Sequence, residues 1–435
     1  MSGGVYGGDE VGALVFDPGH YSFRAGYAGE EFPKTDLPGT VGVLEEMEEA
    51  TSSDAAENSN SKQSVTKRSV TRYFIEPMTR CVPRAGMHLR GMFNKDGFVE
   101  DWDMLEAILD YIYKKPLLCE PKHHPVLMSE PPLTPKNVRE RMTELFFEKF
   151  SAPAFYLSKT PVLAAFANGR SSGLVLDSGE CATTAAAVAD GYCLAQSVVK
   201  TPLGGAMLTD QCRKFFESEQ TEIVPSFQVE SKVAVKPGEP PKWVRKKNLP
   251  EVTPSFTEAM SKELIQDFQS SILQLSDTPY AAENLENVVG SHYEFPNGFN
   301  QEYIEQRLQI AECLFDTAYL KDVNSTTVIP IGLVAANSIA HCDIELRPSL
   351  YNSIIVTGGN SLIHGFVERL NHDLSQKCPP QCKLKLLSAP TTQERRYGSW
   401  TGGSILASLG CFQQMWISRQ EYEESGKHIV DKKCP

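Results

Sequence analysis

Two aspartates, each followed two positions later by a glycine, end apolar segments in matching contexts. Asp17 and Gly19 follow an apolar run that begins at Ala13, and Asp177 and Gly179 follow a similar run that begins at Gly173. Glycine lets the N–H groups of a turn approach an anion, and an aspartate at a strand end can hold hydrated Mg²⁺. One Asp-x-Gly alone is usually only a turn. Two in matched contexts predict a duplicated phosphate-binding hairpin.

A third glycine motif follows another buried strand. The apolar run from Ser353 to Thr357 ends at the pair Gly358 and Gly359. Such a pair would let the backbone lie against a flat base or ribose. The simpler alternative is a close strand-to-helix turn without a ligand.

The elements that must position these motifs alternate between strands and helices. Each Asp-x-Gly precedes a second strand-like run, over residues 21–27 and 182–188. Apolar residues from Leu362 to Leu374 recur at helical spacing before Pro379. We therefore expect an α/β protein with two similar lobes around a central cleft, and the two aspartates facing each other across it.

Composition limits the function classes. The chain has 435 residues, a net charge of −13 and 41% hydrophobic residues, which argues against binding nucleic acid through global charge. No apolar run reaches the ~20 residues needed to span a bilayer, so we expect no membrane association. The first residues do not resemble a secretory signal. The eleven cysteines include no CxxC pair, which favours reduced thiols over zinc or disulfides.

Two stretches differ in composition from the rest of the chain. Residues 44–70 are rich in Glu and Ser, so we expect a flexible surface insertion. Residues 236–247 combine prolines with a basic cluster around Trp243, and we expect a loop there. This loop would contact nucleic acid or an acidic partner, or simply be solvated.

Over nearly its whole length, the chain resembles the actin family of the actin, hexokinase and Hsp70 fold. The resemblance is carried by residues 400–427, 25–29, 139–142, 153–156 and 394–397. It implies a two-lobed α/β architecture. The first lobe would comprise residues 1–160 and 396–435, and the second residues 161–395.

Other segments resemble nuclear actin-related subunits of BAF (SWI/SNF-type) chromatin remodelling complexes more than conventional actins. They are residues 1–12, 124–130 and 292–298. The resemblance implies a nuclear scaffold that pairs with actin on the helicase-SANT-associated helix of a remodeller ATPase. It also implies membership of histone acetyltransferase complexes, an indirect contact with chromatin, and a role in transcriptional regulation.

The same resemblance implies a nucleotide site for ATP or ADP with Mg²⁺. The family's positions fall on Asp17, Gly19, Arg24, Asp177, Gly179, Gly358, Gly359, Arg396 and Tyr397, with Asp17 and Asp177 holding Mg²⁺ through water. Arg24 stands where actin has Lys. Because the rings of His20 and Tyr21 replace smaller groups in the first turn, a nucleotide-free state stays open.

Departures at two positions predict absent or very weak hydrolysis. Thr160 aligns with the glutamine that positions the attacking water in actin, and Thr184 aligns with the assisting histidine. Loss of both groups removes water positioning and proton relay.

The partner-helix groove of actins falls on Phe166, Ala167, Gly169 and Ser171. The alternative is that Phe166 is ordinary core.

Two other functions remain as alternatives. One is a cytoskeletal actin-type ATPase that polymerises, although the acidic stretch at 44–70 would repel a second copy. The other is a sugar or acetate kinase on the same fold, for which no catalytic carboxylate is evident.

Overall fold

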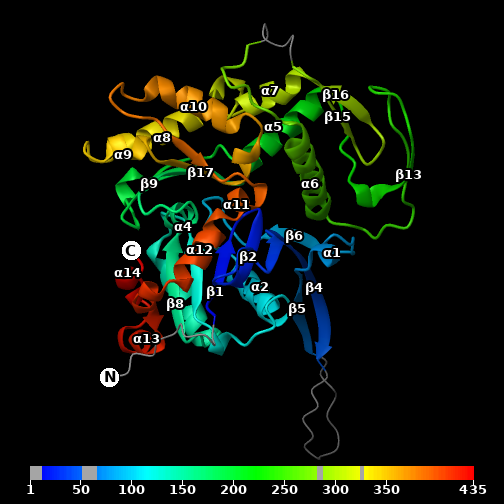
Figure 1. The fold of residues 1–435 in the computed structure, drawn as a ribbon. Coiled ribbons are helices and arrows are strands. Elements are labelled where there is room, and N and C mark those ends of the chain that lie inside the picture. Colours follow the sequence, from blue (N-terminus) through cyan, green and yellow to red (C-terminus); the bar gives the residue numbers. More distant parts are fainter. Residues whose placement is uncertain (1–11, 51–65, 282–287, 324–327) are drawn as a thin grey trace, which may run out of the picture.

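The computed structural model describes residues 12–50, 66–281, 288–323 and 328–435. It has two α/β lobes, one above the other in Figure 1, each built on a six-stranded sheet. The sequence thus correctly predicted a two-lobed α/β fold.

The sheet of the first lobe has the order β19-β8-β7-β1-β2-β3. Its strands are β1 (Leu14–Pro18), β2 (Ser22–Tyr27), β3 (Thr35–Pro38), β7 (Val126–Glu130), β8 (Ala154–Lys159) and β19 (Ile417–Ser418). The hairpin β1–β2 is antiparallel, and β7 and β8 continue the sheet in parallel from β1.

The second sheet repeats this arrangement, with the order β11-β10-β9-β17-β18 and β12 paired to β10. Its strands are β9 (Gly173–Ser178), β10 (Thr183–Ala189), β11 (Tyr192–Cys193), β12 (Val199–Thr201), β17 (Ile354–Thr357) and β18 (Leu386–Ser388). An antiparallel hairpin, β9–β10, again lies beside two parallel strands. The duplication predicted from the two Asp-x-Gly motifs is therefore confirmed at the level of topology.

Helices cover the two sheets. The longer ones are α2 (Trp102–Lys114), α3 (Lys136–Glu144), α5 (Gly205–Ser218), α6 (Pro254–Ile272), α8 (Ile331–Ala340) and α10 (Phe366–Lys377). The shorter ones are α1 (Pro77–Arg80), α7 (Glu305–Glu312), α9 (Arg347–Tyr351), α11 (Thr392–Arg396), α13 (Arg419–Ser425) and α14 (Ile429–Lys433). The helix expected from Leu362 begins only at Phe366, because Gly365 adopts a left-handed conformation with φ of +84°.

Two helices, α4 (Thr160–Ala167) and α12 (Gly398–Ser408), pack against each other between the lobes. A Cβ at Gly402 would lie 1.8 Å from the Leu163 carbonyl oxygen, so only glycine permits this approach. Trp400 on α12 is fully buried, and its indole N–H donates to the Val15 carbonyl at 3.1 Å. The C-terminal segment is thereby fixed against strand β1.

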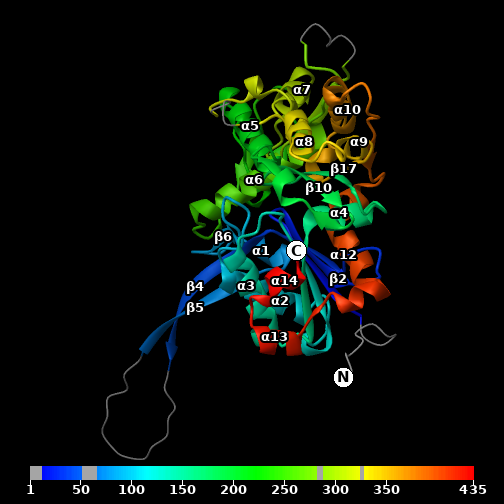
Figure 2. The same ribbon diagram turned by 90° about the vertical axis from the view of Figure 1, so that its left-hand side faces the viewer.

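The stretch over residues 44–70, for which we expect a flexible insertion, has a strand at each end. Residues 44–50 belong to β4 (Thr40–Ala50) and residues 66–70 to β5 (Thr66–Phe74), which pair antiparallel as a long ribbon beside β6 (His88–Gly91). Figure 2 shows this ribbon leaving the body of the first lobe. Backbone pairing and an ion pair of 3.0 Å between Arg72 and Glu46 offset the acidic composition. Residues 51–65 lie outside the described part.

The stretch over residues 236–247, for which we expect a loop, combines a turn with a short strand. Strand β14 (Lys242–Arg245) pairs antiparallel with β13 (Val229–Val233). The prolines at 237, 240 and 241 are confined to the connecting turn, where no ladder hydrogen bond is required of them. The last small ribbon consists of β15 (Ser291–Glu294) and β16 (Asn300–Tyr303).

Within the described residues, no helix is long and apolar enough to cross a bilayer.

Candidate functional site

The two Asp-x-Gly turns are closed in the same way. The Gly19 N–H donates to the Ser22 carbonyl at 3.0 Å, and the Gly179 N–H donates to the Ala182 carbonyl at 3.0 Å. In the first hairpin Asp17 stands opposite Arg24, whereas in the second Asp177 stands opposite Thr184. Equivalent positions therefore carry a cation in one lobe and a neutral hydroxyl in the other.

Protein donors satisfy both oxygens of the Asp17 carboxylate. Arg24 donates from Nη1 to Oδ2 at 2.8 Å, and Ser129 donates its hydroxyl to Oδ1 at 2.5 Å. Arg24 also donates to the Ser22 hydroxyl at 3.1 Å, and its Nε lies 3.6 Å from Asp36. Asp17 is thus a compensated charge that fixes the Arg24 guanidinium.

Asp177 is not compensated in this way. No hydrogen-bond donor contacts its carboxylate in the part of the chain that the structure describes. Burial, and then the negative charge of Asp17, raise the pKa of Asp177 to about 6, although Arg24 acts in the opposite direction. A hydrated divalent cation at this carboxylate would relieve both effects, so the residues present fit Mg²⁺.

The glycine pair lies against the second hairpin. Gly358 has φ of +91°, and a Cβ there would lie 2.3 Å from the Ser178 carbonyl oxygen and 2.5 Å from Asp177 Oδ1. No atom lies within 4 Å of the corresponding position at Gly359, so its surroundings are open. The end of β17 is therefore adjacent to Asp177, as a shared ligand site requires.

Arg396 and Tyr397 contact the first-lobe part of the site through Asp36. The Arg396 guanidinium lies 3.1 Å from Asp36, and the Tyr397 hydroxyl donates to the same carboxylate at 3.2 Å. The Arg24 guanidinium lies over the Tyr397 ring, 5.4 Å from its centroid. Asp36 thus links Arg24, Arg396 and Tyr397 into one network.

Sequence reasoning missed Asp36 and Ser129, which both act on this network. Ser129 lies on β7, the parallel neighbour of β1, where the carboxyl ends of both strands meet. That adjacency follows from sheet order, and only a correct prediction of the β1–β7 pairing could have identified Ser129. No local motif marks Asp36.

The side chains of His20 and Tyr21, in the first Asp-x-Gly turn, differ in burial. His20 stacks on Phe93 with ring centroids 4.4 Å apart, and burial lowers its pKa to about 4, so the ring is neutral at pH 7. Tyr21 is exposed, with Arg396 above its ring at 5.7 Å.

The two threonines at the water-handling positions lie on different elements. Thr160 is the first residue of α4 and is half-buried. Thr184 lies on β10 opposite Asp177, so the two side chains share one face of the hairpin.

The predicted groove positions are accessible. Phe166 and Ala167 are half-buried, and Gly169 and Ser171 are exposed. On the neighbouring helix α12, Ile405 is 38% exposed, and Leu409, which directly follows that helix, is 37% exposed. We call Phe166, Ala167, Gly169, Ser171, Ile405 and Leu409 the α4–α12 strip. Phe166 is therefore not a fully buried core residue.

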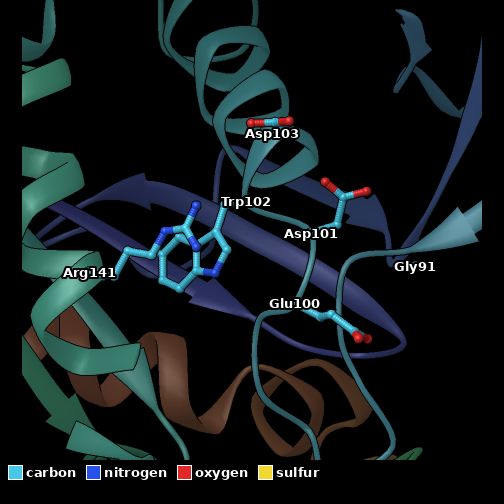
Figure 3. Close-up of a pocket in the computed structure, with 6 residues that line it drawn as sticks. All are labelled: Gly91, Glu100, Asp101, Trp102, Asp103 and Arg141. Atoms are coloured by element: carbon cyan, nitrogen blue, oxygen red, sulfur yellow. The ribbon is translucent and has the colours of Figure 1, made fainter. Parts of the chain in front are cut away.

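A surface hollow of about 450 Å³ lies elsewhere on the first lobe (Figure 3). It is lined by Gly91, Glu100, Asp101, Trp102, Asp103 and Arg141. Arg141 lies over the Trp102 ring, 4.5 Å from its centroid. None of the residues predicted for the nucleotide site or the partner groove lines this hollow.

Comparisons with known proteins agree on one family. The family model described as Actin matches residues 8–435. The actin-related protein 4 of Arabidopsis thaliana is 37% identical over 99% of this chain and 100% of its own length. The actin-related protein 4 of Neurospora crassa is 35% identical over 99% of this chain and 97% of its own length. The chain therefore belongs to the actin family.

Proposed function

We propose that this protein is a non-catalytic scaffold subunit of nuclear chromatin remodelling and histone acetyltransferase complexes. In this role it pairs with actin on the helicase-SANT-associated helix of a remodeller ATPase. One observation carries the proposal: this actin-family chain is similar over its full length to proteins named actin-related protein 4. It also has threonines, Thr160 and Thr184, where the resemblance to actin expects the glutamine and histidine that handle water. The runs at residues 1–12, 124–130 and 292–298 favour the nuclear role over a cytoskeletal one.

We assign nucleotide binding to the junction between the lobes. The residues that would hold ATP or ADP are Asp17, Gly19, Arg24, Asp177, Gly179, Gly358, Gly359, Arg396 and Tyr397. Magnesium, when bound, would neutralise phosphate charge, and Asp177 would accept hydrogen bonds from its water ligands. Asp17 would act on the phosphates mainly through Arg24, whose guanidinium it holds at 2.8 Å.

The same site lacks the means to activate water. A threonine hydroxyl is too weakly basic to accept a proton at neutral pH, and neither Thr160 nor Thr184 has the reach of the glutamine and histidine of actin. Bound nucleotide would then serve as a structural ligand that stabilises the two lobes against each other.

We assign partner binding to the α4–α12 strip. Phe166 is half-buried near the end of α4, and Ile405 and Leu409 are exposed on and just after α12, the helix that packs against α4. Together they would offer apolar area to one face of an amphipathic helix. The long remodeller helix supplies such a face.

Affinity purification of the tagged protein from nuclear extract, with mass spectrometry of the co-purifying chains, tests the proposal. We expect actin and a remodeller ATPase at comparable abundance. Recovery of cytoskeletal proteins without a remodeller ATPase would contradict it.

The second candidate function is a polymerising ATPase, which the actin-family fold keeps open. Sedimentation under salt conditions that polymerise actin separates the two functions. We expect the protein to stay in the supernatant, and a pellet would support the polymerising function.

A further inference from the structure

The β13–β14 hairpin carries an accumulation of cations in a chain whose net charge is −13. We call residues 228–247 the basic ribbon. Besides Lys232, its exposed cations are Lys236, Lys242, Arg245, Lys246 and Lys247. The structure, within its described residues, shows no carboxylate at ion-pairing distance from any of these five. Between the first and the last of them lies one carboxylate, Glu239, in the turn.

Lys232, on the same hairpin, differs from these five cations because it forms an ion pair. Its ammonium lies 2.7 Å from Glu294 on β15. The five other cations face solvent without such a partner, so their mutual repulsion is offset only by water and salt. A polyanion would relieve that repulsion.

Hydrogen bonds fix the ribbon against the second lobe. The Asn300 side-chain amide donates to the Val235 carbonyl at 3.1 Å, and the Gly238 N–H donates to the Asn300 carbonyl at 2.8 Å. Within the ribbon itself, the Lys246 N–H donates to the Gln228 carbonyl at 2.9 Å and closes the base of the hairpin. Figure 1 places β13 at the outer edge of the second lobe, beside β15 and β16. The cations are therefore presented on a positioned backbone, which lowers the entropy cost of binding.

The residue types indicate which polyanion fits. Four of the five cations are lysines, which act as point charges and suit phosphates better than the bidentate reading of bases. The aromatic residue of the ribbon, Trp243, is half-buried, so it offers less of its ring for stacking on unpaired bases than an exposed indole would. At a rise of ~3.3 Å per residue, the stretch from Lys242 to Lys247 extends ~17 Å, enough to meet several phosphates of a duplex.

We propose that the basic ribbon binds the phosphate backbone of duplex DNA without reading its sequence. Binding through so few cations is weak and strongly salt-dependent, since it releases only a few counterions. The contact goes beyond the scaffold role and uses neither the nucleotide site nor the α4–α12 strip.

Fluorescence anisotropy of a labelled duplex of about 30 base pairs, titrated with the purified full chain between about 50 and 200 mM salt, tests this proposal. The test variant is Lys242→Ala/Lys246→Ala/Lys247→Ala. The matched control, Lys114→Ala/Lys122→Ala/Lys149→Ala, removes the same charge from lysines that pair with Asp110, Glu120 and Glu106.

We expect the test variant to lose affinity at least about tenfold at the lowest salt, and its salt slope to fall by about 2 to 3. The control should change affinity less than about twofold. Unchanged melting temperatures and circular dichroism would show that both variants are folded, as expected for exposed substitutions.

Three results would overturn the proposal. One is the absence of duplex binding by the wild-type protein at the lowest salt. Another is an equal loss of affinity in the test and control variants. The third is tighter binding of poly-glutamate, or of the single strand, than of the duplex, which would assign the ribbon to an acidic peptide or to unpaired nucleic acid.

Discussion

Arg24 holds the carboxylate of Asp17 at 2.8 Å, directly across the first hairpin from it. The corresponding position of the second hairpin is Thr184, which brings no charge to Asp177. One aspartate of the duplicated motif is thus neutralised within the protein, and the other has no such partner among the described residues. This asymmetry gives the two aspartates opposite roles in stability.

We expect Asp177→Asn to stabilise the nucleotide-free protein at pH 7. Because the pKa of Asp177 in the folded protein, about 6, lies above the ordinary value of 3.8 for an aspartate, its ionised form is penalised in the folded state. This destabilisation is present above pH 6 and is relieved as the pH falls toward the unfolded pKa. Asparagine removes it, and urea denaturation should show a gain of about 1 to 2 kcal/mol. A loss of stability would contradict an uncompensated Asp177.

The matching variant Asp17→Asn should act in the other direction. It removes the charge partner of Arg24 and alters the acceptor of the Ser129 hydroxyl in a buried position. We expect the free energy of unfolding to fall by about 1 to 3 kcal/mol in the same urea experiment. Equal effects of the two asparagine variants would show that the site is electrostatically symmetric.

Magnesium-dependent nucleotide binding should weaken in acid. Protonation of Asp177 below its pKa of about 6 removes the charge that would hold the hydrated cation, while Arg24 stays charged. Calorimetry with ADP and Mg²⁺ should show lower affinity at pH 5.5 than at pH 7.5. Asp177→Asn serves as the control, because the terminal phosphate of ADP, with a second pKa of about 6, also titrates in this range. Its affinity should be lower than that of the wild type and should fall less between pH 7.5 and pH 5.5.

Hydrolysis should be absent or far slower than in actin, because Thr160 and Thr184 cannot position and deprotonate water. Phosphate release by the purified protein, with ATP and Mg²⁺ in excess, measures this. Release at the rate of actin, abolished in Asp177→Ala, would show that another group activates water.

The sequence predicted the parts of the fold that local patterns encode. The two Asp-x-Gly motifs predict both hairpins, and the glycine pair predicts a close approach at Gly358, which the structure places against Asp177. Asp36 and Ser129 were not predicted because sheet pairing alone brings them to the site. Asp36 stands opposite Arg24 on β3, and Ser129 lies on β7 beside β1. The strands at 44–50 and 66–70 could not be predicted from composition. Composition reflects the conformational preference of each residue by itself, whereas these strands are stabilised by the pairing of β4 with β5.

The binding of an amphipathic helix tests the scaffold role most directly. The measurement is the affinity of a synthetic helicase-SANT-associated helix for the wild type, for Phe166→Asp, and for Leu118→Asp. Leu118 is 79% exposed on the first lobe and controls for a new surface charge. Replacing residues 51–65 by a short turn should leave binding unchanged. We predict a loss of at least about tenfold for Phe166→Asp, and less than about twofold for Leu118→Asp. Unchanged affinity of a folded Phe166→Asp variant would contradict partner binding at the α4–α12 strip.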